Sequence, residues 1–333
     1  MNQSSFSKQL VSILLIAFLF SCGNSSDSLY PPIQFTQIAS MQGTGRSSAV
    51  AFAVAGKGYV ALGRNQARKG QLKDCWQYDP VLNTWSEKAE FPGLARVKAT
   101  AVVLYDKAYV GLGFNINYGV YNDSACLKDF WVYEPLDDKW TQLANLPSNA
   151  TDACVSFVFN NSIYIGAGFN GANFTNEFWK YDPQQNTWTR LNDFPKLPRA
   201  GAVACSNGNQ VFFGTGYRTI NENDWWEYLP LTDTWKKLKP MPATGRVNAV
   251  ALSINNRYFV SAGRHFGGTL TGGKALSDIL EYDAQHNEWH KRGSIPDEGN
   301  RENAVAFTIN GKGYIGLGEN DITVLNDFWS FVP

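Results

Sequence analysis

The chain has 333 residues, of which 44% are hydrophobic and 14% are aromatic. Lysine and arginine together number 29, as do aspartate and glutamate, so the formal net charge is zero. This balance argues against a general nucleic-acid binder and against a protein held to membranes by surface charge. A single large β-domain is common at this length, so the length does not require two domains.

The first 21 residues predict an export signal. Lys8 precedes an apolar run from Leu10 to Phe20, which is too short for a stable membrane span. The run ends in Ser21-Cys22-Gly23, and this junction resembles a bacterial lipoprotein signal, in which Cys22 becomes the lipidated N-terminus. We therefore expect a signal peptide over 1–21, a flexible tether over 22–32, and a cell-envelope protein anchored in a bacterial membrane, periplasmic or on the cell surface. An ordinary secretory signal cut nearby is the alternative.

Behind the leader, one pattern recurs six times at a period of roughly 50 residues, a spacing typical of propeller blades. Each unit begins with a small, apolar inner strand, as in 49–54, and a second strand follows that ends in glycine four residues after an aromatic residue. These glycines are Gly63, Gly113, Gly168, Gly216, Gly263 and Gly318.

Each unit continues with an acidic residue and, in all but the fifth unit, two aromatic residues at alternate positions, which in the first unit are Asp74, Trp76 and Tyr78; the fifth unit has Leu280 before Tyr282. Alternation at period two predicts a third strand with both aromatic rings on one face. A turn follows, as at Asp79-Pro80, and Trp85 then opens a fourth strand. The sequence therefore predicts four strands per unit.

This four-stranded unit resembles the kelch repeat, and the resemblance covers nearly the whole chain after residue 32. It implies an all-β fold, a six-bladed kelch-type β-propeller. The sixth unit stops after its third strand, and Phe35, Ile38 and Met41 reproduce the spacing seen from Trp85 onward. We expect the N-terminal strand to close the last blade of a propeller over 33–333. The blades are predicted at 46–91, 96–146, 151–194, 199–241, 246–295, and 301–333 plus 33–41.

The loops between the second and third strands, and between successive blades, are predicted to open on one end of the propeller, which we name the long-loop face. An arginine ring lies there, and Thr151 takes the arginine position in the third blade. Because acidic residues recur with the same period, we interpret the ring as scaffold that pairs with the blade acids, with a ligand funnel as the alternative. The ring consists of Arg46, Arg96, Arg199, Arg246 and Arg301.

Function is more strongly indicated where the repeat is broken or where side chains follow the glycines. Arginine holds carboxylates, amides bind hydroxyl groups, and aromatic rings stack on sugars. These properties predict a ligand site for a glycan or a protein partner, with no nucleic acid. The candidate residues are Arg64, Asn65, Phe114, Phe169, Tyr217, Arg218, Arg264, His265 and Glu319.

Catalytic candidates are few. Three histidines are present, and His286 and His290 are predicted on the face opposite His265, so no metal site is expected. Copper galactose oxidases also use kelch propellers, but their chemistry requires histidines and tyrosines that converge, and we reject that activity for this chain. Glu319 flanked by Arg264 and Arg64 at the pore mouth would provide a general base or an anchor, with an ion pair at the rim as the alternative.

The chain also resembles bacterial sialic acid mutarotases, which are exported six-bladed kelch proteins that act on an acidic sugar. We predict a recognition module without a cofactor; the alternative is an enzyme of the mutarotase or epimerase type on an acidic sugar, using Glu319 with Arg264 and, more weakly, His265. Cys154 and Cys205 are predicted to be buried. A disulfide between Cys75 and Cys126 is left open.

Overall fold

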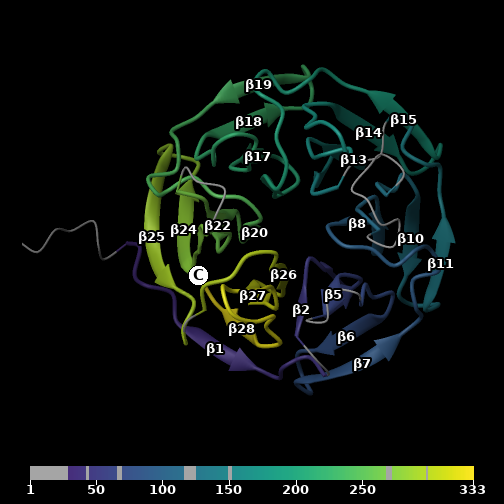
Figure 1. The fold of residues 1–333 in the computed structure, drawn as a ribbon, viewed down its shortest axis with the longest axis horizontal. Helices are drawn as coiled ribbons and strands as arrows, with labels where there is room; N and C mark the ends of the chain where they lie inside the picture. Colours follow the sequence, from purple (N-terminus) through teal and green to yellow (C-terminus); the bar gives the residue numbers. More distant parts are fainter. Residues whose placement is uncertain are drawn as a thin grey trace, which may run out of the picture. The chain divides into compact units, whose positions relative to one another are not determined.

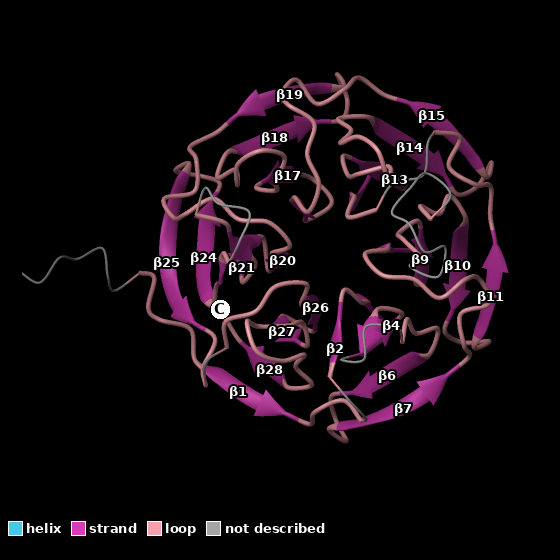
Figure 2. Ribbon diagram, in the orientation of Figure 1, coloured by secondary structure: helices cyan, strands magenta, loops and turns pink. Residues whose placement is uncertain are grey.

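Six antiparallel four-stranded sheets are arranged around a central axis (Figure 1). The computed structural model describes residues 29–333 except 43–44, 66–69, 116–124, 149–151, 268–271 and 298. The predicted signal and lipidated Cys22 lie outside the described residues and stay predictions. In the described part, strands are joined by loops and turns (Figure 2), and no helix there is long and apolar enough to cross a membrane.

Each sheet is one blade, whose first strand lies nearest the axis and whose last strand lies outermost. Blade 1 comprises β3 (Val50–Val54), β4 (Lys57–Ala61), β6 (Cys75–Asp79) and β7 (Thr84–Lys88). Blade 2 comprises β8 (Thr100–Leu104), β9 (Lys107–Gly111), β10 (Phe130–Glu134) and β11 (Lys139–Gln142). Blade 3 comprises β12 (Val155–Phe159), β13 (Ser162–Gly166), β14 (Phe178–Asp182) and β15 (Thr187–Arg190).

Blades 4 to 6 comprise β16 (Val203–Ser206), β17 (Val211–Gly214), β18 (Trp225–Leu229) and β19 (Thr234–Lys237); β20 (Val250–Ile254), β21 (Arg257–Ser261), β24 (Asp278–Asp283) and β25 (Glu288–Ser294); and β26 (Val305–Ile309), β27 (Lys312–Gly316), β28 (Phe328–Phe331) and β1 (Phe35–Ile38). Two short ribbons add β2 (Arg46–Ser47) with β5 (Arg64–Asn65), and β22 (Arg264–His265) with β23 (Lys274–Ala275).

The ring is closed by the N-terminal strand, as the sequence predicts. β1 pairs antiparallel with β28, and Phe35 lies opposite Phe331 while Gln37 lies opposite Trp329. The rings of Phe35 and Phe331 have their centroids 5.2 Å apart. Because β1 covers the outer edge of β28, blade 6 does not end on an unpaired three-stranded edge. The prediction of six blades with an N-terminal closing strand is therefore confirmed.

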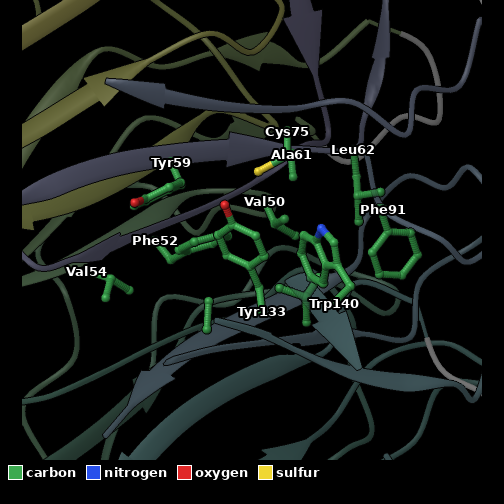
Figure 3. Packing of buried hydrophobic residues seen from close by; sticks show 12 residues of the cluster. Val50, Phe52, Val54, Tyr59, Ala61, Leu62, Cys75, Phe91, Tyr133 and Trp140 are labelled. Carbon is green, nitrogen blue, oxygen red and sulfur yellow. The ribbon is translucent and has the colours of Figure 1, made fainter. Parts of the chain in front are cut away.

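The hydrophobic core is divided among the six junctions between neighbouring blades. Figure 3 shows the junction of blades 1 and 2, where Phe52 and Tyr59 of blade 1 meet Tyr133 and Trp140 of blade 2. The Tyr59 and Tyr133 rings contact edge to face, with centroids 5.8 Å apart. Each blade therefore depends on both neighbours to cover its faces, which explains why the aromatic residues recur in every unit.

The recurring polar residues also join the blades. The indole of Trp85 donates to the Ala39 carbonyl at 2.9 Å, and the Asn83 side chain accepts from both the Ala39 amide and the Tyr78 hydroxyl. Blade 2 repeats the tryptophan contact, since Trp140 donates to a carbonyl of the preceding blade. The turn residues of the repeat thus fix each outer strand to its neighbour.

The arginine ring is scaffold, as we interpreted it. Arg96 is fully buried and donates to both carboxylate oxygens of Asp129 at 2.7 Å and to the Leu112 carbonyl at 3.0 Å. The same bidentate clamp joins Arg46 to Asp74, Arg199 to Asp224, Arg246 to Asp278, and Arg301 to Asp327. In blade 3, Thr151 lies outside the described residues, and Glu177 accepts from Ser148 and Trp179.

None of the four described cysteines forms a disulfide. Cys75 in β6 and Cys126 in a loop of blade 2 are both buried, so the disulfide that the sequence leaves open is not formed. Cys205 is buried in β16, as predicted, and Cys154 is partly buried just before β12.

Candidate functional site at the pore mouth

A closed ring of backbone hydrogen bonds surrounds the pore at the long-loop face. Each of its six residues lies two positions after the arginine position of its blade and has a positive φ, from 50° to 61°. Each amide donates to the carbonyl of the equivalent residue in the preceding blade, at 2.9 to 3.1 Å. We call this set the pore-mouth ring: Ser48, Lys98, Ala153, Gly201, Asn248 and Asn303.

Two asparagines of the ring hold carboxylates above the pore. Asn248 donates to Glu302 at 2.9 Å, and Asn303 donates to Glu319 at 3.0 Å. Asparagine tolerates the left-handed conformation better than most residues, so its use at these positions causes little strain. Glu302 and Glu319 also exchange backbone hydrogen bonds at 2.9 and 3.0 Å, which places the two acidic residues next to each other.

Both carboxylates are engaged by arginines. Arg64 donates to both oxygens of Glu319 at 2.7 Å. Arg264 forms ion pairs with Glu302 and with Asp321, the latter at 2.7 Å. Burial alone would lower the pKa of Arg264, but the hydrogen bonds and charges of Glu302 and Asp321 outweigh it and raise the pKa, so the guanidinium stays charged.

These pairings confirm the expected contact of Glu319 with Arg64 but differ from its expected association with Arg264. Glu319 takes Arg64 as its arginine, whereas Arg264 turns to Glu302 and Asp321. The reason is the backbone pairing of Glu302 with Glu319, which supplies two adjacent carboxylates for two arginines. In the structure Glu319 therefore forms an ion pair with Arg64, which is the alternative to a general base that the sequence analysis gave for this residue.

Two cavities meet above the ring. The first, which we call the charged cavity, has a volume of about 360 Å³. Its polar wall combines the Arg64 side of the ion-pair network with the ring asparagines and Gln71. The described residues that line it are Ser48, Arg64, Gln71, Val97, Lys98, Phe114, Asp152, Asn248, Glu302 and Asn303.

The second cavity, which we call the aromatic cavity, has a volume of about 320 Å³ and lies over blades 3 to 5. Four aromatic side chains from three loops form its walls, and Ala153 and Gly201 of the ring lie at its base. It shares Lys98, Asp152 and Asn248 with the charged cavity. Its described lining residues are Lys98, Asp152, Ala153, Phe169, Phe174, Ala200, Gly201, Tyr217, Val247, Asn248 and Phe266.

Deeper in the pore, a further cavity of about 380 Å³ is walled by the inner strands. Its described lining consists of small and apolar residues such as Ala51, Ala101 and Ala251 with a few hydroxyl groups such as Ser156, and it contains no charged side chain. A site that has to orient a polar ligand requires convergent polar groups. The pore mouth meets this requirement, and the deep cavity does not.

The predicted site residues divide into those that line these cavities and those that do not. Arg64 and Phe114 line the charged cavity, and Phe169 and Tyr217 line the aromatic cavity. The others border neither cavity directly. Glu319 and Arg264 support the charged wall through ion pairs; Asn65 pairs with Arg46 in a ribbon; Arg218 is exposed; and His265 bonds to the Gly245 carbonyl at 2.8 Å.

The lining residues that were not singled out from the sequence include Lys98, Asp152, Phe174 and Phe266, and also Glu302 and the ring asparagines Asn248 and Asn303. Lys98 lines both cavities, and it takes part in none of the ion pairs formed among the described residues. Lys98 has a left-handed backbone conformation, with φ of 53°, which is unusual for a lysine. This signal is visible in the structure, where Lys98 occupies a position of the pore-mouth ring, and not in the sequence. No group of metal-ligating side chains suited to a metal ion is found in the part of the chain that the structure describes.

Comparisons with known proteins agree with this architecture. A family model of the kelch motif matches residues 152–195, which is one blade. A solved structure titled "Structure of YjhT" aligns over 87% of this chain and 96% of its own, with a TM-score of 0.72 at 20% sequence identity. The chain carries a kelch motif on a six-bladed β-propeller.

Sequence relatives match shorter parts of this kelch propeller. Kelch-like protein 25 of Xenopus tropicalis is 35% identical over 107 residues, which are 32% of this chain and 18% of that protein. N-acetylneuraminate epimerase of Haemophilus influenzae is 26% identical over 161 residues, covering 38% and 43%. The epimerase of Yersinia enterocolitica is 30% identical over 135 residues, covering 40% and 31%. The chain thus matches less than half the length of each of these relatives.

Proposed function

We propose that the pore mouth binds a glycan that carries an anionic group, and that the protein acts as a recognition module of the cell envelope. The observation that carries this proposal is Lys98. Its backbone is fixed by the pore-mouth ring, the residue lines both cavities, and the carboxylates of Glu319 and Glu302 pair with Arg64 and Arg264 instead. A carboxylate on a ligand would supply the counter-charge for Lys98.

The surroundings of Lys98 suit hydroxyl groups. The ion pair of Arg64 with Glu319 and the amides of Asn248 and Asn303 are mutually fixed by hydrogen bonds. Such groups offer donors and acceptors whose orientation is set before the ligand arrives, which lowers the entropic cost of binding. Because both arginines are already neutralised by acidic partners, the polar wall favours hydroxyl groups over a second negative charge.

The proposal is tested by glycan-array screening and calorimetry of the full-length protein, with Lys98→Met as the variant. Loss of a hydrogen-bonded charge costs about 1.5–3 kcal/mol, so we expect affinity for an acidic glycan to fall about 10- to 150-fold. Lys312→Met is the matched control, because Lys312 is the first residue of β27 and lines neither cavity, and this variant should bind as the unmodified protein does. Equal binding by Lys98→Met and the control would contradict the proposal, as would selection of neutral glycans only.

A second candidate function is an enzyme that interconverts forms of an acidic sugar. It is favoured by the similarity of part of the chain to two N-acetylneuraminate epimerases. Glu319 is the carboxylate that would move a proton; Arg64 would hold it in place, and Arg264 would hold the neighbouring Glu302. NMR of anomer exchange in N-acetylneuraminate, with and without the protein, measures this directly. An enzyme accelerates exchange and loses this in Glu319→Gln; a pure binding module leaves the exchange rate unchanged.

A further inference from the structure

The aromatic cavity is not used by the recognition of hydroxyl groups and charge described above. Its walls join loops of three blades, with Phe169 and Phe174 from blade 3, Tyr217 from blade 4 and Phe266 from blade 5. All four side chains are partly buried rather than exposed. A ligand that filled the charged cavity alone would leave this apolar hollow beside it.

The hollow exists because of two residues of the pore-mouth ring. In blades 5 and 6 the ring carries Asn248 and Asn303, whose side chains rise to Glu302 and Glu319. In blades 3 and 4 the equivalent residues are Ala153 and Gly201, which have almost no side chain to place there. A Cβ on Gly201 would come within 2.4 Å of a Val247 methyl group, so this position has to stay glycine.

The walls are held by contacts among the aromatic rings. Phe169 and Phe174 have ring centroids 5.0 Å apart, Phe174 meets Tyr217 edge to face at 6.4 Å, and Tyr217 meets Phe266 edge to face at 5.6 Å. Because neighbouring rings are tilted against each other, the aromatic cavity is lined by both ring faces and ring edges. Planar aromatic groups pack well against both, by offset stacking and by edge-to-face contact.

Volume and charge define what fits. A buried apolar cavity of about 150 Å³ holds one benzene molecule, and the aromatic cavity has about 320 Å³, room for one or two fused rings. Lys98 and Asp152 both lie at the shared edge of the two cavities, but Asp152 is only 1% exposed, so the charge that an occupant meets there is the more exposed Lys98, which opposes a cationic group. A neutral planar group whose carrier bears the anionic group toward Lys98 satisfies both conditions.

We infer that the ligand carries a planar apolar substituent of one or two rings, so that the protein recognises an aryl glycoside or a sugar esterified with an aromatic acid. The substituent occupies the aromatic cavity and the sugar occupies the charged cavity. This inference rests on the proposed function for the sugar part, but the aromatic cavity can be tested by itself with simple carboxylates.

The experiment titrates the full-length protein with 2-naphthoate, followed by its fluorescence, and with benzoate and acetate by competition. We expect affinity to rise from acetate to benzoate to 2-naphthoate by at least tenfold overall. Ala153→Asn fills the base of the cavity with the residue that the ring already uses at two other positions, and it should weaken 2-naphthoate at least tenfold. Ala55→Asn makes the same substitution at an exposed alanine that is also in the left-handed region, at φ 49°, in the turn between β3 and β4 and outside both cavities, and it should alter 2-naphthoate affinity less than twofold.

The outcomes separate the two proposals. If 2-naphthoate binds no better than acetate, or if Ala153→Asn binds it as the unmodified protein does, the inference is overturned. If an acidic glycan binds equally well to the unmodified protein and to Ala153→Asn, the inference about the aromatic substituent is overturned while the proposed function is left intact. Should Ala153→Asn not fold, Phe174→Leu with Tyr217→Leu replaces it, since both substitutions keep apolar volume and remove the rings; unchanged 2-naphthoate binding there overturns the inference as well.

Discussion

The buried arginine clamps lead to a quantitative prediction for Arg96→Met. Arg96 is fully buried and donates to the Leu94 and Leu112 carbonyls and to both oxygens of Asp129. Methionine keeps much of the packing but leaves the Asp129 carboxylate without its counter-ion, with only 19% of that side chain exposed to water. Removing one partner of a buried ion pair costs about 3–5 kcal/mol, so we expect destabilisation of that size.

Urea or thermal unfolding of the purified protein measures this loss. At about 2 °C per kcal/mol for a large domain, the midpoint of thermal unfolding should fall by about 6–10 °C. Lys239→Met is the control, because the Lys239 and Glu288 side chains are 55% and 52% exposed and such a surface pair should be worth about 0–1 kcal/mol.

A double-mutant cycle shows whether the loss comes from the pair. Asp129→Asn keeps an acceptor for the Trp131 indole but removes the charge. The double variant should be less destabilised than the sum of the two single variants, by about 1–3 kcal/mol. Strict additivity, or an Arg96→Met loss no larger than that of Lys239→Met, would refute the reasoning.

Three further predictions concern stability and reactivity. Burial would raise the pKa of Asp129 and Asp327, but Arg96 and Arg301 outweigh burial and lower both pKa values below the ordinary 3.8. The stabilisation that these two ion pairs give the folded protein is complete above pH 3.8 and is lost as the pH falls through the lowered pKa values. The urea midpoint should therefore drop between about pH 5 and pH 2. Met41→Ala, 2% exposed beside the closing strand, should cost about 2–5 kcal/mol in unfolding free energy, and exposed Leu136→Ala under about 0.5. Burial raises the pKa of the Cys75 and Cys205 thiols to about 12, so Ellman's reagent at pH 8 should modify them only after unfolding, and modification of the folded protein would disprove this.

Most of the fold was predictable because the repeat encodes contacts between blades. The amide of Gly63, at φ 88°, donates to the Arg96 carbonyl of the next blade, and a Cβ there would approach the Ser47 carbonyl oxygen to 2.7 Å. Glycine and arginine therefore recur together because one hydrogen bond joins them. The closing strand was predictable for the same reason, since Phe35 and Met41 occupy the places of an outer strand.

The site was predictable only in part. Phe169 and Tyr217 directly follow repeat glycines, so their place above the pore could be derived from the period. Phe174 and Phe266 lie within loops whose path no repeat fixes, and their convergence depends on tertiary structure. Lys98 was missed because it stands in a run of ordinary strand residues. Its exposure to both cavities depends on a backbone conformation that the lysine itself does not favour.

The pore-mouth ring has one more consequence, for how new specificities arise. Its hydrogen bonds use main-chain atoms alone, so serine, lysine, alanine, glycine and asparagine all occupy equivalent places without interrupting it. At the five ring positions other than Gly201, substitution changes the side chain at the pore mouth while the main-chain hydrogen bonds of the ring persist. Selection can therefore change the side chains that a ligand meets at these positions of the pore mouth without changing the main-chain hydrogen bonds that join the blades there.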